Sequence, residues 1–432
     1  MNKHEALWTT MFNIFNPLVP VSGEHIKAWF VEREHSPLPR LELALRPDRR
    51  EQKVLLAGQR GSGKTSELFR LMSRKKEDYY TVYTDLSPVA SQEAISAIEV
   101  FFSLGAAIYK SAQTDGLKPK KETWEQLVSS LSTLARERSE TLDLLAPLNF
   151  VLATSAAVYP PVAPLAEAGS ALLSGLKIGR KDLEKIELEP VLREVVARVN
   201  LILSDVSSKA GKPILLIADG LDKIKHFELA TALFNHTWAF TQLPCQAVYV
   251  APPILYYSVR FQEIGDYFTC EELPNVRLHI KGQREHKDVE GWATMRKLVE
   301  NRLKAAALDG AVQVFAPEAL ELLIEKSGGV MRDMVELIRY ASMEAELLNA
   351  GRIDLQAAQR AAANMRRKIQ AGLFKEDYEA ILSFQRDCDV AKQNSTQMEL
   401  LRGNLIVNYE NGGFWRDLHP LVLDIMNERS VG

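Results

Sequence analysis

A glycine-rich segment ending in lysine and threonine, Gly58 to Thr65, is the part of this sequence best suited to chemistry. Glycines allow a backbone to turn its N–H groups inward around an anion, and the N-terminal end of a following helix adds positive potential. A lysine and a hydroxyl at the end of such a loop can reach phosphate oxygens and a magnesium ion. The spacing Gly-x-x-x-x-Gly-Lys-Thr therefore predicts a phosphate-binding loop (P-loop) for ATP and Mg²⁺. A plain glycine-rich turn is the alternative interpretation.

Each residue of the loop has an expected part in binding. We expect Lys64 to reach the β and γ phosphates, and the Thr65 hydroxyl to bind Mg²⁺. The residues that we expect to line the nucleotide are consecutive: Gly58, Gln59, Arg60, Gly61, Ser62, Gly63, Lys64, Thr65 and Ser66.

A second candidate segment lies far downstream, where the apolar run 214–218 ends at Asp219 and Asp222 follows three residues later. A buried strand delivers its last residue to the carboxyl edge of a parallel sheet, where ligands bind in open α/β folds. Asp219 is predicted to hold the Mg²⁺ shell, and Asp222 to orient the attacking water. An ordinary strand end remains the alternative for either carboxylate.

The elements that must position these residues alternate between strands and helices. Strands are expected at 53–57, 79–86, 214–218, 246–251 and 276–280, from their apolar, aromatic and β-branched residues. Helices are expected between them, at 94–110, 124–138 and 191–203, and from about Gly282 onward the pattern becomes mostly helical. The alternation predicts an α/β fold with a parallel sheet.

The segment from Asp219 to Asp222, Asp-Gly-Leu-Asp, resembles the second nucleotide motif of the STAND ATPases, a branch of P-loop proteins near AAA+. That family usually has glutamate at the next position, where this chain has Lys223, and this departure argues against vigorous hydrolysis. Upstream, 29–34 is similar to a segment that lies over the adenine in STAND and Orc/Cdc6-type ATPases. The resemblance implies that Val31 touches adenine and that Arg33 is a nucleotide or interface sensor. An amphipathic segment that covers the sheet is the alternative.

Residues 315–333 read as a helix, a Gly328-Gly329 turn and a second helix, with Arg332 in its first turn. This arrangement resembles the sensor-2 region of AAA+ and Orc/Cdc6 lids, where such an arginine meets the γ-phosphate. A structural salt bridge is the alternative for Arg332. Further on, strands on either side of 410–413 predict a β-hairpin after helices, which resembles a winged-helix domain.

Charge argues against nucleic acid at this C-terminal unit. Residues 375–432 contain six Lys or Arg and ten Asp or Glu, whereas a DNA-reading surface needs basic residues for phosphate contacts. Of the two aromatic residues Phe414 and Trp415, strand alternation predicts that one faces the unit's own core. We therefore expect packing on the ATPase core or a protein partner, and regard nucleic acid as a possible but not favoured partner.

Composition is that of an ordinary globular protein, with 432 residues, 46% hydrophobic and 25% charged, and a net charge of −3. The three cysteines match no metal-ligand spacing, and the default expectation is a reduced, cytoplasmic location. The stretch 144–166 has no charged residue but contains four prolines, so two short packed helices are expected rather than a membrane span.

Three parts are predicted. Residues 1–281 form the P-loop core with a helical insertion at 113–189, residues 282–372 form a helical lid, and residues 373–432 form a small winged-helix-like unit. The predicted function is a STAND/AAA+-type ATPase switch in signalling or complex assembly, with a protein partner or self-association. A bacterial conflict or antiviral defence role is a fold-level analogy. The alternatives are an Orc/Cdc6-like DNA-associated loader or regulator and a non-hydrolysing ATP-dependent scaffold.

Overall fold

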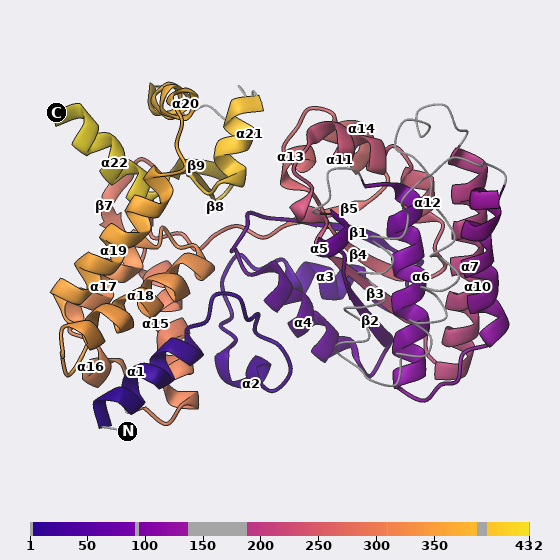
Figure 1. Cartoon of the computed structure of the whole chain (residues 1–432), viewed down its shortest axis with the longest axis horizontal. Coiled ribbons are helices and arrows are strands. Elements are labelled where there is room, and N and C mark those ends of the chain that lie inside the picture. The colour runs from indigo at the N-terminus through magenta and orange to yellow at the C-terminus, as the bar shows by residue number, and fades with distance from the viewer. Residues whose placement is uncertain (1–2, 91–94, 137–187, 309, 387–394, 432) are drawn as a thin grey trace. The chain divides into compact units, whose positions relative to one another are not determined.

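The computed structural model describes residues 3–90, 95–136, 188–308, 310–386 and 395–431. The expected helices at 144–166 lie outside these residues. The chain divides into two compact units, each described below by itself. The first unit contains residues 1–39, 57–73 and 272–432, and the second contains residues 40–56 and 74–271. Figure 1 labels their helices and strands.

The second unit is built on a five-stranded sheet in the order β2-β3-β4-β1-β5. Pairing is parallel between β2 and β3, β3 and β4, and β4 and β1. The three inner strands are buried at every position and are apolar except at one end residue each, Lys53, Asp219 and Gln246, as expected for a parallel sheet covered on both faces. The strands are β1 (Lys53–Ala57), β2 (Tyr80–Asp85), β3 (Ile214–Asp219), β4 (Gln246–Val250) and β5 (Thr269–Glu272).

Helices surround this sheet, and the longest three, α6, α7 and α10, pack on one another (Figure 1). A capping box begins α6, in which the Ser96 hydroxyl accepts from the Glu99 N–H and the Glu99 carboxylate accepts from the Ser96 N–H. The helices are α3 (Leu38–Ala44), α5 (Ser87–Ala90), α6 (Ala97–Thr114), α7 (Lys121–Arg136), α10 (Leu188–Ala210), α11 (Phe227–Phe234), α12 (Thr237–Thr241), α13 (Pro253–Tyr256) and α14 (Phe261–Gly265), with a 3₁₀ turn η3 (Leu221–Lys223).

The first unit is mostly helical and has one large apolar core, to which α1, α15, α17, α18 and α19 contribute. Its helices are α1 (Lys3–Ile14), α2 (His25–Trp29), α4 (Lys64–Lys75, whose last two residues belong to the second unit), α15 (Val289–Ala305), α16 (Ala311–Val314), α17 (Pro317–Lys326), α18 (Met331–Leu347), α19 (Leu355–Gln370), α20 (Lys375–Arg386), α21 (Ser395–Arg402) and α22 (Pro420–Val431). Two antiparallel ribbons complete it, β6 (His279–Ile280) with β7 (Gln283–Lys287) and β8 (Ile406–Glu410) with β9 (Phe414–Leu418).

The predicted helix, Gly-Gly turn and helix are confirmed, since α17 and α18 flank Gly328 and Gly329 with φ of 58° and 72°. A Cβ on Gly329 would lie 1.7 Å from the carbonyl oxygen of Val276, so only glycine fits there. The predicted hairpin is also confirmed, as are the parallel α/β sheet and the mainly helical region that follows it.

The prediction of a fifth sheet strand at 276–280 is wrong. The fifth strand of the sheet is β5, whereas only His279–Ile280 of the predicted segment 276–280 is extended in a ribbon, and that ribbon is separate from the sheet. Val276 donates its N–H to Gly329 and Leu278 accepts from the Trp292 indole, so these backbone groups are used by helical neighbours. Because β5 is a half-buried edge strand of polar residues, it carries no strong apolar pattern.

Candidate functional site

The P-loop has the backbone that phosphate binding requires. Gly58, Gly61 and Gly63 have φ of 146°, 87° and 101°, which side-chain-bearing residues rarely adopt. A Cβ on Gly58 would lie 2.7 Å from the carbonyl oxygen of Leu273, so the loop also needs glycine for space. Because α4 begins at Lys64, the positive N-terminal end of its helix dipole follows the loop directly.

Lys64 is buried, with only 5% of its surface exposed. Its Nζ donates to the carbonyl oxygens of Gly58 at 2.8 Å and Gln59 at 3.0 Å, both in its own loop. Thr65 follows in the first turn of α4 and is half-buried, and the hydroxyl of Ser66 accepts from the N–H of Val21 at 3.1 Å. The Lys64 ammonium group is therefore held at the loop, where it can donate hydrogen bonds to an anion that the loop binds.

The Gln59 side chain makes all of its hydrogen bonds to other protein groups. Its Nε2 donates to the carbonyl oxygens of Leu401 at 3.0 Å and Ile406 at 2.6 Å. Its Oε1 accepts from the Asn275 amide at 2.7 Å and from the Asn408 N–H at 2.6 Å. The side chain is 2% exposed and uses its full hydrogen-bonding capacity on the protein, so only its backbone is available to a nucleotide.

Arg33 contacts the loop. Its Nη2 donates to the carbonyl oxygen of Ser62 at 2.8 Å, and its Nη1 to that of Pro274 at 3.3 Å. Its Nε pairs with the buried Glu67 carboxylate at 3.2 Å. Val31, by contrast, is 7% exposed and belongs to the helical core of the first unit.

Arg332 also lies beside the loop. It is the second residue of α18, and its backbone N–H donates to the carbonyl oxygen of Gly61 at 3.1 Å. A Cβ on Gly61 would lie 2.9 Å from the Cβ of Arg332. The structure thus brings the loop, Arg33 and Arg332 together within the first unit. Arg60 is exposed, and its carbonyl oxygen accepts from the Asn404 amide at 2.7 Å.

A pocket of about 420 Å³ opens beside Arg33. Its walls come from the segment after α2, the segment before β6 and the first turns of α15. They carry charges of both signs, among them Arg33, Arg277, Lys297, Glu34 and Glu290. Arg277 pairs with Asp288 at 2.7 Å. A hydrogen bond with Glu34 raises the pKa of the Glu290 carboxyl above its usual range. The pocket also contains Asn275, which contacts Gln59 of the loop.

In the second unit, Asp219 ends β3 as predicted and is 6% exposed. Its Oδ2 accepts from the Tyr83 hydroxyl at 3.1 Å, and its Oδ1 from the Gly220 N–H at 2.7 Å. Burial, and next the negative charge of Asp219, raise the pKa of Tyr83, which keeps the phenol protonated and donating. In the parallel sheet, Leu56 of β1 pairs with Val250 of β4, and Ala218 of β3 pairs with Tyr249 of β4. Asp219 therefore lies at the same carboxyl edge of the sheet as the end of β1.

Asp222 lies in the 3₁₀ turn and forms an ion pair with the next residue, with 3.3 Å between its Oδ1 and the Nζ of Lys223. The Asp222 side chain is 6% exposed, whereas that of Lys223 is 34% exposed. The lysine that departs from the family pattern therefore contacts the carboxylate expected to orient water.

Sequence reasoning missed Asn275, Asn408 and Glu67, which hold the loop or its neighbours. Asn408 also donates from its side chain to the Glu272 carboxylate at 2.5 Å. These residues lie far from the loop in sequence and belong to no motif. The one available signal was the polar Asn408 between Val407 and Tyr409 in β8.

Within the described part of the chain, no helix is long and apolar enough to cross a membrane. No protein-family model matches the sequence, and none of the curated proteins matches it.

Among solved structures, the chain is similar to a Walker-type ATPase of Pyrococcus abyssi, with 15% identity, 96% of this chain and 99% of that chain covered, and a TM-score of 0.49. It is also similar to the ORC1 protein of Aeropyrum pernix in complex with DNA, with 14% identity, coverage of 97% and 96%, and a TM-score of 0.44. A third is Cdc6p of Pyrobaculum aerophilum, with 10% identity, coverage of 96% and 98%, and a TM-score of 0.42.

Proposed function

We propose that this chain binds ATP with Mg²⁺ at Gly58–Thr65 and acts as a slow ATPase switch of the STAND/AAA+ type in signalling or complex assembly. The observation that carries the proposal is the conformation of the loop. Three glycines at positive φ, a buried lysine directed at the loop's own carbonyl groups, and a helix that starts at that lysine fit a chain of phosphates.

Each residue then has a stated part. Lys64 neutralises the β and γ phosphates, and the loop N–H groups bind their oxygens. The Thr65 hydroxyl and the Asp219 carboxylate are hard oxygen ligands, and a bound Mg²⁺ ion would neutralise charge on the phosphates. Tyr83 and Gly220 fix the Asp219 carboxylate in one orientation.

The base and ribose are assigned to the pocket beside Arg33. Its volume of about 420 Å³ lies within the usual range of ligand pockets, and Arg33 contacts both this pocket and the carbonyl oxygen of Ser62. We propose that Arg33 and Arg332, which both contact the loop, report the state of the nucleotide to the helical part of the first unit. An adenine contact is also proposed for Val31, which is 7% exposed in the helical core.

The ion pair between Asp222 and Lys223 supports slow rather than fast hydrolysis. To orient water, the Asp222 carboxylate must accept a hydrogen bond from the water molecule. The neighbouring Lys223 ammonium group competes for the same carboxylate oxygens. A nucleotide-dependent scaffold without turnover is the second candidate, and this ion pair is the observation that favours it.

A DNA-associated loader is the weaker alternative. In the hairpin that would form the wing, Arg416 is 8% exposed, and Asp417 is held by His279 and Arg284. Trp415 packs in a cluster with Val407 and Tyr409, as strand alternation predicted, which leaves Phe414 exposed. This surface offers few free cations to phosphates.

The test compares turnover and binding in Asp219→Asn and Asp222→Asn. We expect Asp222→Asn to slow hydrolysis while ATP affinity stays within a few-fold, because it acts on the water. Asp219→Asn should also weaken Mg²⁺-dependent binding, which is measured by titration with and without the metal. Identical behaviour of the two variants would refute the separate roles, and a wild type that binds ATP without turnover would establish the scaffold.

A further inference from the structure

Gln59 is buried for a reason that phosphate binding does not explain. A phosphate is bound by backbone N–H groups of the loop, so the side chain at this position is free to do something else. Here it makes four hydrogen bonds, two donated and two accepted, which is all that a primary amide can make. The amide is 2% exposed and has all four hydrogen bonds, so the protein itself holds this side chain in place.

The partners of Gln59 come from three segments of the first unit. Leu401 lies in α21, Ile406 and Asn408 lie in β8, and Asn275 lies in the segment before β6 that also lines the pocket. One side chain of the phosphate loop therefore binds the C-terminal hairpin and the pocket wall at once. A second link is parallel to it, from the Asn404 amide to the carbonyl oxygen of Arg60.

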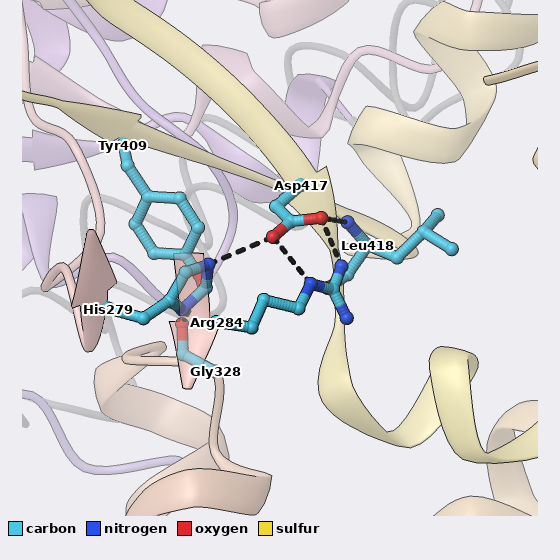
Figure 2. A network of polar contacts seen from close by, with 6 residues as sticks. All are labelled: His279, Arg284, Gly328, Tyr409, Asp417 and Leu418. Atoms are coloured by element: carbon cyan, nitrogen blue, oxygen red, sulfur yellow. Dashed lines mark hydrogen bonds and ion pairs between the residues drawn. The ribbon is translucent and has the colours of Figure 1, made fainter. Parts of the chain in front are cut away.

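The hairpin is fixed on its other side to the helical part of the unit. Figure 2 shows the Asp417 carboxylate of β9 between His279 and Arg284 of the β6–β7 ribbon, at 2.9 Å from the His279 Nε2 and 2.8 Å from the Arg284 Nε. The Tyr409 hydroxyl of β8 donates to the carbonyl oxygen of Gly328 at 2.7 Å, just before α18. The hairpin is thus the shared neighbour of the loop and the turn that leads to Arg332.

We propose that Gln59 is a positioning residue that couples the phosphate loop to the β8–β9 hairpin, so that bound nucleotide and hairpin packing stabilise each other. The inference rests on the proposed ATP binding at this loop. Since water cannot replace the partners of a buried amide, a shift of the loop at Gln59 must break several hydrogen bonds together, which makes the contact cooperative. The loop held in this way already has its three glycines at positive φ, so Gln59 keeps it ready for a ligand.

Thermodynamic linkage requires the effect to be reciprocal. If the hairpin contact favours ATP binding, ATP binding must favour the hairpin contact by the same factor. Couplings between sites are typically about 5- to 150-fold, and we expect roughly tenfold here. The Asn408 N–H is a direct reporter, because its hydrogen bond goes to the Gln59 side chain.

The experiment measures ATP affinity by calorimetry, together with hydrogen exchange of residues 404–410 with and without saturating ATP, on the full chain. In the wild type, ATP should slow exchange in the hairpin. Gln59→Ala should weaken ATP binding about tenfold and abolish the ATP-dependent slowing. Gln59→Glu should do the same, because it keeps the volume but replaces the NH₂ group that donates both bonds by one carboxylate oxygen, which would face the Leu401 and Ile406 carbonyl groups.

Arg402→Ala is the matched control. Arg402 follows Leu401 in α21, it is exposed, and its ion pair with Glu399 stays within that helix. This variant should retain both the affinity and the exchange response. Asn275→Ala removes one of the four hydrogen bonds and should show a partial loss, which tests the coupling if Gln59→Ala does not fold.

Two results would overturn the inference. One is a wild type that binds ATP without any change in hairpin exchange. The other is a folded Gln59→Ala that retains the wild-type response, because Gln59 would then have only a structural part. A wild type that does not bind ATP at all would instead refute the proposed function, so the two failures are distinguishable.

Discussion

Replacing Gly61 by alanine should damage the loop in a way that the structure makes quantitative. Gly61 has φ of 87°, and an added Cβ would lie 2.9 Å from the Cβ of Arg332 and 3.1 Å from the Cγ1 of Val330. The Cβ of Arg332 is fixed to the backbone of α18 and cannot rotate away. The backbone strain costs about 1–2 kcal/mol, and overpacking in a closed contact costs about 1–3 kcal/mol more.

Gly282→Ala separates these two costs. Gly282 has a similar φ of 74°, but nothing lies within 4 Å of an added Cβ, so only the backbone strain remains. Both variants belong to the first unit, and both can be followed by urea unfolding. Gly61→Ala should lose about 1–3 kcal/mol more stability than Gly282→Ala, which is the overpacking cost alone. It should also lose ATP affinity, because its carbonyl oxygen and the Arg332 N–H can no longer keep their contact.

Equal losses of stability in the two variants would refute the reasoning, since the close approach of α18 to the loop would then not exist in solution. An unchanged ATP affinity in a folded Gly61→Ala would refute the claim that this approach shapes the binding loop. Calorimetric titration of both variants with ATP and Mg²⁺ supplies that second measurement.

Three further predictions follow from single contacts. Lys223→Ala should raise the ATP turnover number a few-fold by releasing the Asp222 carboxylate from its ion pair, and a rate equal to wild type in a steady-state assay would count against this role. Burial alone would raise the pKa of Asp417, but hydrogen bonds from His279 and Arg284 hold it below its usual range. Its contribution to stability is therefore present above the unfolded pKa of about 3.9 and is lost as pH falls through the lower folded value. Asp417→Asn should remove this contribution, so the stability of the variant should depend less on pH in acid unfolding followed by circular dichroism. A pH dependence equal to that of the wild type would contradict the network. The full chain should show no micromolar binding to duplex DNA in a gel-shift titration at near-physiological salt, and salt-sensitive binding there would promote the loader alternative.

Much of this architecture was predictable because local signals are strong where a backbone is constrained. The motif required glycines at Gly58 and Gly63, and both have positive φ, as does Gly61 between them. The buried strand before Asp219 was evident from five apolar residues in a row, and the turn at Gly328-Gly329 from its position between two amphipathic helices. Each of these features depends on residues that are close together in the sequence.

The contacts that complete the site were not predictable, because they join distant segments. Nothing near Gln59 in the sequence shows that β8 would satisfy its amide, more than three hundred residues downstream. Lys64 shows the same limit, since the sequence places it in a binding loop but not against the carbonyl oxygens of Gly58 and Gln59. The strand β5 was missed because an edge strand needs no continuous apolar run.

The central claim is that Gly58–Thr65 binds ATP, and calorimetric titration of the wild type and Lys64→Ala with ATP and Mg²⁺ tests it most directly. The wild type should bind with one site per chain. Lys64→Ala should abolish binding, because it removes the charge opposite the β and γ phosphates, while circular dichroism and thermal unfolding show that the fold persists. A folded Lys64→Ala with the ATP affinity of the wild type would contradict the account.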